Sequence, residues 1–132
     1  MNRYIKLLSV ILILGTFLLG CSGESSLKKG WIETSGLKHS RVKYNYFDGV
    51  ERKIFRAQPG ETIHLDLEVE VDQGSLVVKL LDAQGELIWN ETFQDDAQET
   101  VSIAASEGGR YQIRLEGEAA EGGFEFSWET DS

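Results

Sequence analysis

The sequence predicts an all-β protein that folds as an antiparallel two-sheet β-sandwich of about seven or eight strands. After residue 30, short runs of alternating apolar and polar residues dominate the chain, as in strands with one buried face. Turn-forming residues separate these runs at intervals of about 8 to 12 residues. Apolar residues at helical spacing are nearly absent, and the single proline, Pro59, lies between two runs. An open barrel is the alternative architecture.

The first predicted strands lie between residues 41 and 56. Residues 41–46 and 50–56 are expected to form a hairpin, because Asp48 and Gly49 between them are typical of a tight turn. A further turn at residues 58–60 ends this part of the chain.

The clearest strand is residues 63–71, which alternates strictly between apolar and polar residues. Residues 72–74 predict a turn after it. The next run, residues 76–81, is apolar on both faces except at Lys79, which is typical of a strand in the middle of a sheet.

The remaining strands follow one another with short connections. Residues 82–85 fit a hairpin loop with glycine at the position that needs a positive φ, and residues 86–93 are the returning strand. The later strands are predicted at residues 99–103, 110–116 and 124–129, with turns at 106–109 and 121–123.

The amino-terminal residues have a different pattern. Arg3 and Lys6 precede an apolar run at residues 7–20, which is shorter than the ~20 residues of a membrane-spanning helix. This pattern predicts an export signal peptide. The run ends in Leu-Leu-Gly directly before Cys21, the only cysteine, and this ending resembles the lipobox of bacterial lipoproteins.

The lipobox resemblance implies that residues 1–20 are removed and that the Cys21 thiol carries a diacylglyceryl group with palmitate-type chains. Two acyl chains anchor a protein stably, so the protein is expected on the cell membrane, facing outside the cytoplasm. The polar, Gly/Ser-rich residues after the cysteine predict that residues 21–30 are the lipidated cysteine and a flexible tether. Residues 31–132 are then expected to form one sandwich domain.

Part of the strand pattern resembles a known family. Residues 60–69, 74–76, 80–85 and 109–115 are similar to GOLD-like and bacterial pre-peptidase C-terminal-like β-sandwich domains. In these domains a strand is followed by a D-x-x-G hairpin, an extended segment and a G-x-Y-x-I/F-x-L/V strand. The resemblance implies a non-catalytic domain used for protein contacts or as an accessory module. It assigns no binding residue.

The mature chain is strongly acidic. The whole sequence has a net charge of −9, and residues 1–20 hold two of its 13 basic residues and none of its 22 acidic residues. Such a chain repels phosphate groups, which argues against nucleic acid and against electrostatic docking onto anionic lipid head groups. Solubility alone also accounts for a net charge of this kind.

A row of polar residues on one strand is a candidate cation site. His64, Asp66, Glu68 and Glu70 share a face, with neighbours ~6.5 to 7 Å apart. Calcium takes about six to eight converging oxygen ligands, which a flat strand supplies only with help from loops. A solvated strand face explains the same pattern.

Aromatic residues are a second candidate site. Trp31, Tyr44 and Tyr46 could stack on sugar rings, although packing in the core explains aromatic residues equally well. Trp128 is expected in the core together with Phe124 and Phe126, because the three alternate with polar residues.

No catalytic residue, cofactor or enzyme activity is predicted. Only His39 and His64 could act as imidazole bases, and no nucleophile, zinc or phosphate-loop motif accompanies them. The leading hypothesis is a lipid-anchored module that binds an envelope or secreted protein. The alternatives are a binder of cell-wall glycan that uses exposed aromatic side chains, and a cation-stabilised accessory domain.

Overall fold

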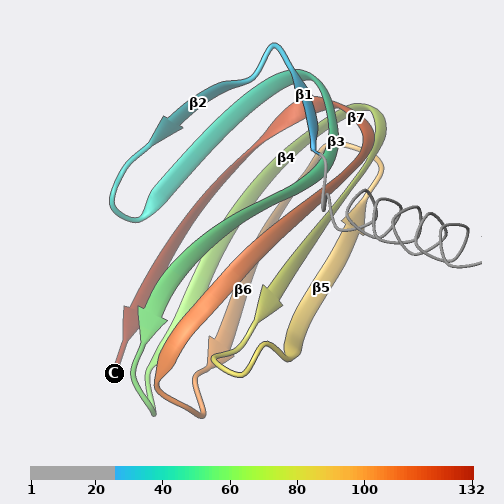
Figure 1. Ribbon diagram of the computed structural model, residues 1–132. Helices are drawn as coiled ribbons and strands as arrows, with labels where there is room; N and C mark the ends of the chain where they lie inside the picture. The colour runs from blue at the N-terminus through green and yellow to red at the C-terminus, as the bar shows by residue number, and fades with distance from the viewer. Residues whose placement is uncertain (1–25) are drawn as a thin grey trace, which may run out of the picture.

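The computed structural model describes residues 26–132. The predicted signal peptide and Cys21 lie outside the described residues. The described chain is all-β, with antiparallel pairing throughout, which confirms the predicted fold class (Figure 1). Its strands are β1 (Leu27–Lys29), β2 (Ile32–Ser35), β3 (His39–Ala57), β4 (Thr62–Leu81), β5 (Leu87–Phe93), β6 (Ala97–Ala104) and β7 (Gly109–Asp131). From residue 26 onward, no helix is long and apolar enough to cross a membrane.

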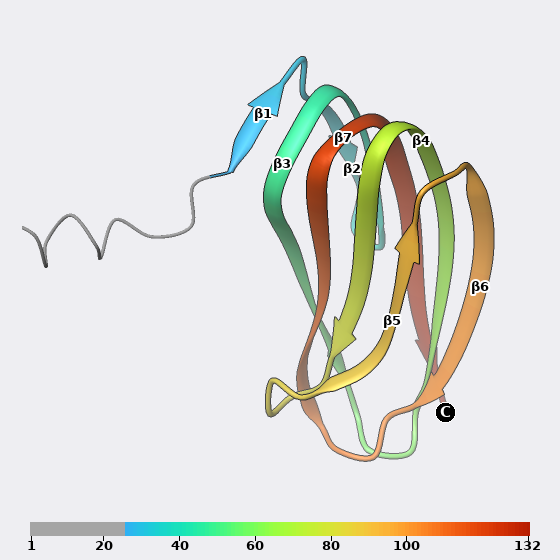
Figure 2. The ribbon, with the colours of Figure 1, turned by 90° about the vertical axis from the view of Figure 1, so that its right-hand side faces the viewer.

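Three long strands, β3, β4 and β7, arch over and contribute to both layers of the sandwich (Figure 2). The first layer, sheet I, has the order β2, β3, β7, β4, β6 and contains the first halves of β3 and β4 and the second half of β7. The second layer, sheet II, has the order β1, β3, β7, β4, β5 and contains the other halves. The edges stay open, so the structure is a sandwich rather than a closed barrel.

The places where the long strands bend are those where the sequence predicted turns. The predicted hairpin at residues 41–56 and the turns at 72–74 and 121–123 are therefore wrong, because each strand continues through the bend into the other sheet. Register shifts mark the bends of β3 and β4, and Gly74 and Gly122 have φ of 73° and 139°. Glycine serves in a bend for the reason it serves in a turn, since it adopts positive φ without a Cβ penalty.

Carboxylates accept hydrogen bonds from backbone amides at two bends. The N–H of Val71 in β4 donates to Oδ1 of Asp96 at 2.9 Å, and the N–H of Ala119 in β7 donates to Oδ2 of Asp48 at 3.3 Å. A bulge leaves amides outside the strand ladder, and an unpaired buried amide is costly. These aspartates therefore stabilise the bends.

The hydrophobic core lies between the two layers and is rich in aromatic side chains. Phe47, Tyr111 and Phe126 are among its largest fully buried members, and burial of such a side chain contributes roughly 1.5 to 3 kcal/mol. Trp128 packs against this core beside Phe126, with ring centroids 5.6 Å apart. The expectation that the last strand supplies core aromatics is confirmed.

The folded part of the chain begins earlier than the predicted tether allowed. Strand β1 (Leu27–Lys29) pairs with β3, and Lys28 forms an ion pair with Glu51. The hydroxyl of Ser26 also accepts a hydrogen bond of 3.0 Å from the N–H of Val50. The absence of apolar periodicity concealed β1, because its three residues are all exposed and are held by backbone pairing.

The hairpin predicted at residues 82–85 is confirmed. The amide of Gly85 donates to the carbonyl of Asp82 at 3.0 Å, and Asp82 Oδ1 accepts from the amides of Gln84 and Glu86, both at 2.9 Å. Gly85 has φ of 82°, the positive value expected at this position.

Candidate functional site

The outward face of sheet I carries a row of polar side chains that crosses all five strands. The strand register places Thr34, Arg41, Glu125, Glu68 and Gln98 side by side on β2, β3, β7, β4 and β6. Neighbouring strands lie ~4.8 Å apart. The row, hereafter the polar row, therefore offers a hydroxyl, a guanidinium, two carboxylates and an amide at short, regular intervals.

Two shorter rows flank the polar row. On one side, His39, Ser127, Asp66 and Thr100 are paired across β3, β7, β4 and β6. On the other side, Lys43, Gly123 and Glu70 are paired across β3, β7 and β4. Apart from Gly123, the residues of the three rows carry polar, hydrogen-bonding side chains, and none of them is Phe, Tyr or Trp.

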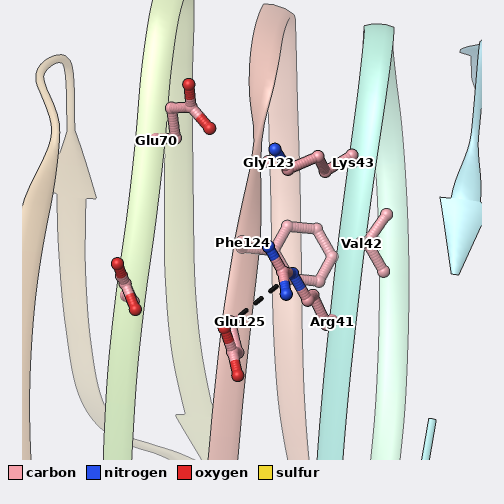
Figure 3. A pocket seen from close by; sticks show the side chains of 8 residues that line it. Arg41, Val42, Lys43, Glu70, Gly123, Phe124 and Glu125 are labelled. Atoms are coloured by element: carbon pink, nitrogen blue, oxygen red, sulfur yellow. Dashed lines mark ion pairs between the residues drawn. The ribbon is translucent and has the colours of Figure 1, made fainter. Parts of the chain in front are cut away.

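Depressions adjoin one another along this face. The smallest, of about 70 Å³, lies over Gly123 between Lys43 and Glu70, and Figure 3 shows these residues on neighbouring strands. Two larger hollows of about 350 and 380 Å³ both touch Glu68 and extend to β6. A fourth, of about 350 Å³, lies at Arg41, Lys43 and β2. Together they form a shallow groove across the sheet, because consecutive hollows share lining residues.

Glycine at position 123 explains the centre of the groove. Its neighbours Lys43 and Glu70 have long side chains, whereas Gly123 has none, so the sheet is hollow between them. A Cβ at this position would lie 2.5 Å from the carbonyl oxygen of Val42. Close packing of the backbones of β3 and β7 therefore requires glycine here.

Polar side chains in the groove contact one another. Glu125 Oε1 lies 2.8 Å from Nε2 of His39, and Glu125 Oε2 lies 4.0 Å from Nε of Arg41, the pair marked in Figure 3. In the flanking row, the hydroxyl of Thr100 donates to Oδ1 of Asp66 at 3.0 Å. These contacts orient side chains before any ligand arrives, which lowers the entropy cost of binding.

The four residues predicted as a cation site do not converge. His64 Nδ1 lies 3.0 Å from the hydroxyl of Ser102, and His64 Nε2 lies 3.0 Å from Oδ2 of Asp131. Asp66, Glu68 and Glu70 instead line the groove on β4. Within residues 26–132, no group of three or more His, Cys, Asp or Glu side chains could hold a metal ion. The flat strand explains this, since it points successive carboxylates in parallel.

The three aromatic candidates do not form an exposed platform. Tyr44 is 4% exposed and stacks on Trp31, with ring centroids 5.7 Å apart and planes at 16°. Trp31 is half-buried against the core, and Lys28 Nζ lies 4.3 Å from its ring centroid. Tyr46 is half-buried, with Lys29 Nζ 5.7 Å from its ring centroid. Packing, rather than ligand stacking, explains Trp31 and Tyr44.

The sequence prediction missed Arg41, Lys43, Glu125 and Gln98 as site residues. Alternation in the last strand indicated only that Glu125 faces outward. Register across four strand pairs decides which outward residues become neighbours, and no local pattern carries that information.

No family model matches the chain, and no curated protein matches it. Its fold is similar to that of solved structures. One, described as "CBM4 structure and function", matches with a TM-score of 0.51 at 14% identity over 85% of this chain and 79% of that one. Another, TmCBM61 in complex with β-1,4-galactotriose, matches with a TM-score of 0.51 at 14% identity over 83% of this chain and 88% of that one. The chain therefore shares the β-sandwich fold of these two carbohydrate-binding modules.

Proposed function

We propose that this protein is a non-catalytic glycan-binding module, held on the outer side of the cell membrane by lipid on Cys21. The observation that carries the proposal is the groove across sheet I, where five strands contribute the polar row. The fold shared with two carbohydrate-binding modules supports it. The hypothesis of an envelope-protein partner ranks second, because those structures offer it no support.

The chemistry of the groove suits a polyhydroxylated chain. Sugar hydroxyls both donate and accept hydrogen bonds, and the polar row supplies acceptors at Glu68 and Glu125 and donors at Arg41 and Gln98. Hydrogen bonds to charged groups are about twice as strong as neutral ones. An open groove that crosses the whole sheet accommodates an extended chain rather than a compact small molecule.

The groove also indicates which glycans to expect. Carboxylates outnumber cationic side chains along it. Four carboxylates line the groove, against Arg41 and Lys43, and they are Asp66, Glu68, Glu70 and Glu125. Acidic polysaccharides would meet like charges. We therefore infer an uncharged or amino-bearing glycan, recognised through hydrogen bonds rather than through the exposed aromatic side chains that the sequence suggested.

A glycan array tests the function directly. The wild-type chain is expected to bind a restricted set of neutral or amino glycans, and Arg41→Ala is expected to weaken that binding about 10-fold, because it removes a charged donor. The matched control is Arg56→Ala, since Arg56 is an exposed arginine on the same strand, β3, at an outward position of sheet II. Absence of any glycan ligand, or equal losses in the two variants, would overturn the proposal.

A further inference from the structure

The two outer faces of the sandwich carry opposite charge. The outward positions of sheet II in β3, β7 and β4 hold five basic residues and one acidic residue, Glu116, and the basic ones are Arg52, Arg56, Lys79, Arg110 and Arg114. The groove face of sheet I is dominated by carboxylates. The net charge of −9 conceals this separation, and so the sequence alone argued against contact with anionic lipid.

Apolar side chains lie among the basic ones. Ile54 is 58% exposed and lies between Arg52 and Arg56 on β3, and Leu87 at the edge of the same sheet is 49% exposed. The register places Ile54 opposite Gln112, Gln112 opposite Leu81, and Leu81 opposite Leu87. Sheet II therefore presents a row of three apolar side chains, interrupted by Gln112, with arginines beside it, hereafter the basic face. A surface of this kind suits the boundary between lipid head groups and acyl chains.

The start of the described chain lies next to sheet II. Ser26 contacts Val50 at the start of the sheet II half of β3, and β1 pairs with residues 46–48 of β3, where that strand bends. Ser26 follows Cys21 by only five positions in the sequence, a span of at most ~18 Å when fully extended. A lipid on Cys21 therefore keeps the domain close to the bilayer, and some part of its surface must face the head groups.

The distribution of charge indicates which part of the surface faces the head groups. The end of the sandwich where the strands bend carries four acidic residues against Lys28 and Lys29 of β1, and the acidic ones are Asp48, Asp72, Glu118 and Glu121. Its net charge is therefore negative, and anionic head groups would be repelled. The basic face attracts them, and each basic side chain near an anionic membrane strengthens binding about 5-fold.

We propose that the basic face docks on anionic lipid and so turns the groove of sheet I away from the membrane. The occupant is a bilayer rich in an anionic phospholipid such as phosphatidylglycerol. This orientation rests on the lipid anchor proposed above and is independent of which glycan the groove binds.

Site-specific labelling of the reconstituted lipoprotein tests the orientation. Cys21 is the only cysteine and its thiol is bonded to lipid in the anchored protein, so Ile54→Cys introduces one free thiol for an environment-sensitive fluorophore. The matched label is Gln98→Cys on the outward face of sheet I. Both proteins are placed in vesicles of phosphatidylcholine with and without phosphatidylglycerol, and quenching by brominated lipids is measured.

We expect the label at residue 54 to be quenched strongly in anionic vesicles and weakly in neutral ones, and the label at residue 98 to be quenched weakly in both. In the Ile54→Cys protein, the double substitution Arg56→Glu and Arg110→Glu is expected to reduce the docked-to-free ratio by about 30-fold or more. Equal quenching at the two positions, stronger quenching at residue 98, or no response to phosphatidylglycerol would overturn the proposal. Because no glycan is present, these outcomes leave the glycan-binding proposal standing.

Discussion

Glu125 lies 2.8 Å from His39 through Oε1 and 4.0 Å from Arg41 through Oε2, so one carboxylate contacts an imidazole and a guanidinium on the neighbouring strand. All three side chains are partly exposed, and exposed ion pairs contribute only ~0 to 1 kcal/mol to stability. The arrangement therefore contributes little to stability, and under the proposed function it would position Arg41 and Glu125 for a ligand.

Replacement of this carboxylate tests that explanation. Glu125→Gln is expected to weaken glycan binding about 10-fold, because it removes a charged acceptor and its hold on Arg41. The melting temperature is expected to stay nearly constant, since surface substitutions usually change stability within about ±0.5 kcal/mol. Isothermal titration calorimetry and thermal denaturation measure the two effects. Glu116→Gln on sheet II is the matched control for binding, and an equal loss there would contradict the role of Glu125.

Two tyrosines differ in the partners of their hydroxyl groups. The hydroxyl of Tyr44 is buried without a hydrogen-bond partner, whereas that of Tyr111 donates to the carbonyl of Glu107 at 2.6 Å. Tyr44→Phe is therefore expected to leave stability unchanged or to raise it by up to ~1 kcal/mol, and Tyr111→Phe to lower it by ~1 kcal/mol. Urea denaturation measures both. A larger loss for Tyr44→Phe than for Tyr111→Phe would contradict this assignment.

The same burial predicts the titration of Tyr44. Desolvation, with the nearby charges of Asp72 and Glu70, raises the pKa of Tyr44 to about 12. In an ultraviolet titration of the folded protein, the absorbance change near pH 12 is expected to disappear in Tyr44→Phe. An unchanged titration curve would show that the Tyr44 hydroxyl does not ionise near pH 12, and would contradict this assignment.

Two carboxyl groups meet at the open edge between the sheets. Glu91 of β5 and Glu99 of β6 both occupy inward positions. A hydrogen bond that protonated Glu99 donates to the carboxylate of Glu91 raises the pKa of Glu99, with smaller effects of burial and of the Glu91 charge. The folded protein then binds this proton more tightly than the unfolded chain does. The pair therefore stabilises below the ordinary glutamate pKa of about 4.3, and that contribution is lost as the pH rises through the raised value.

Glu91→Gln is expected to keep a hydrogen bond to Glu99 while removing the second charge. The melting temperature should then fall less between about pH 4 and pH 7 than in the wild type. Glu86→Gln, at an exposed loop position, is the control and should retain the wild-type slope. A steeper fall of the melting temperature with pH in Glu91→Gln than in the wild type would contradict the shared hydrogen bond.

Two glycines with similar φ, Gly74 and Gly85, allow the cost of backbone strain to be distinguished from the cost of crowding at the bends. Gly74 and Gly85 have φ of 73° and 82°, but a Cβ at Gly74 would lie 2.2 Å from the carbonyl oxygen of Ala119, whereas one at Gly85 would meet nothing within 4 Å. Gly85→Ala is expected to cost about 1 to 2 kcal/mol from strain alone. Gly74→Ala should cost clearly more. Equal costs in chemical denaturation would show that the bends of β4 and β7 are not tightly packed.

The class of fold was predictable because alternation and turn signals are local. The path of the long strands was not, because residues such as Gly74 and Gly122 serve equally in a turn and in a bend. Whether the chain reverses or continues depends on its pairing partners: Val71 and Ser75 both remain paired with β7 through the bend of β4. A turn would instead have paired the two halves of β4 with each other.

The candidate site, like the path of the long strands, could be predicted from the sequence only in part. Asp66, Glu68 and Glu70 were identified from their shared face on one strand, and they do lie in the groove. Arg41 and Glu125 are more than 80 residues apart in sequence, so only the register of β3 with β7 brings them together. The aromatic candidates failed for a different reason, since alternation does not reveal which layer covers Tyr44.

The central claim is that the groove across sheet I binds glycan, and nuclear magnetic resonance tests it most directly. The ¹⁵N-labelled protein would be titrated with the oligosaccharide selected by the array. We predict shift changes concentrated at Arg41, Glu68, Gln98, Gly123 and Glu125, with little change at Arg56 and Arg110 on the basic face. Changes centred on the basic face or at the strand edges, with the groove unaffected, would contradict the account.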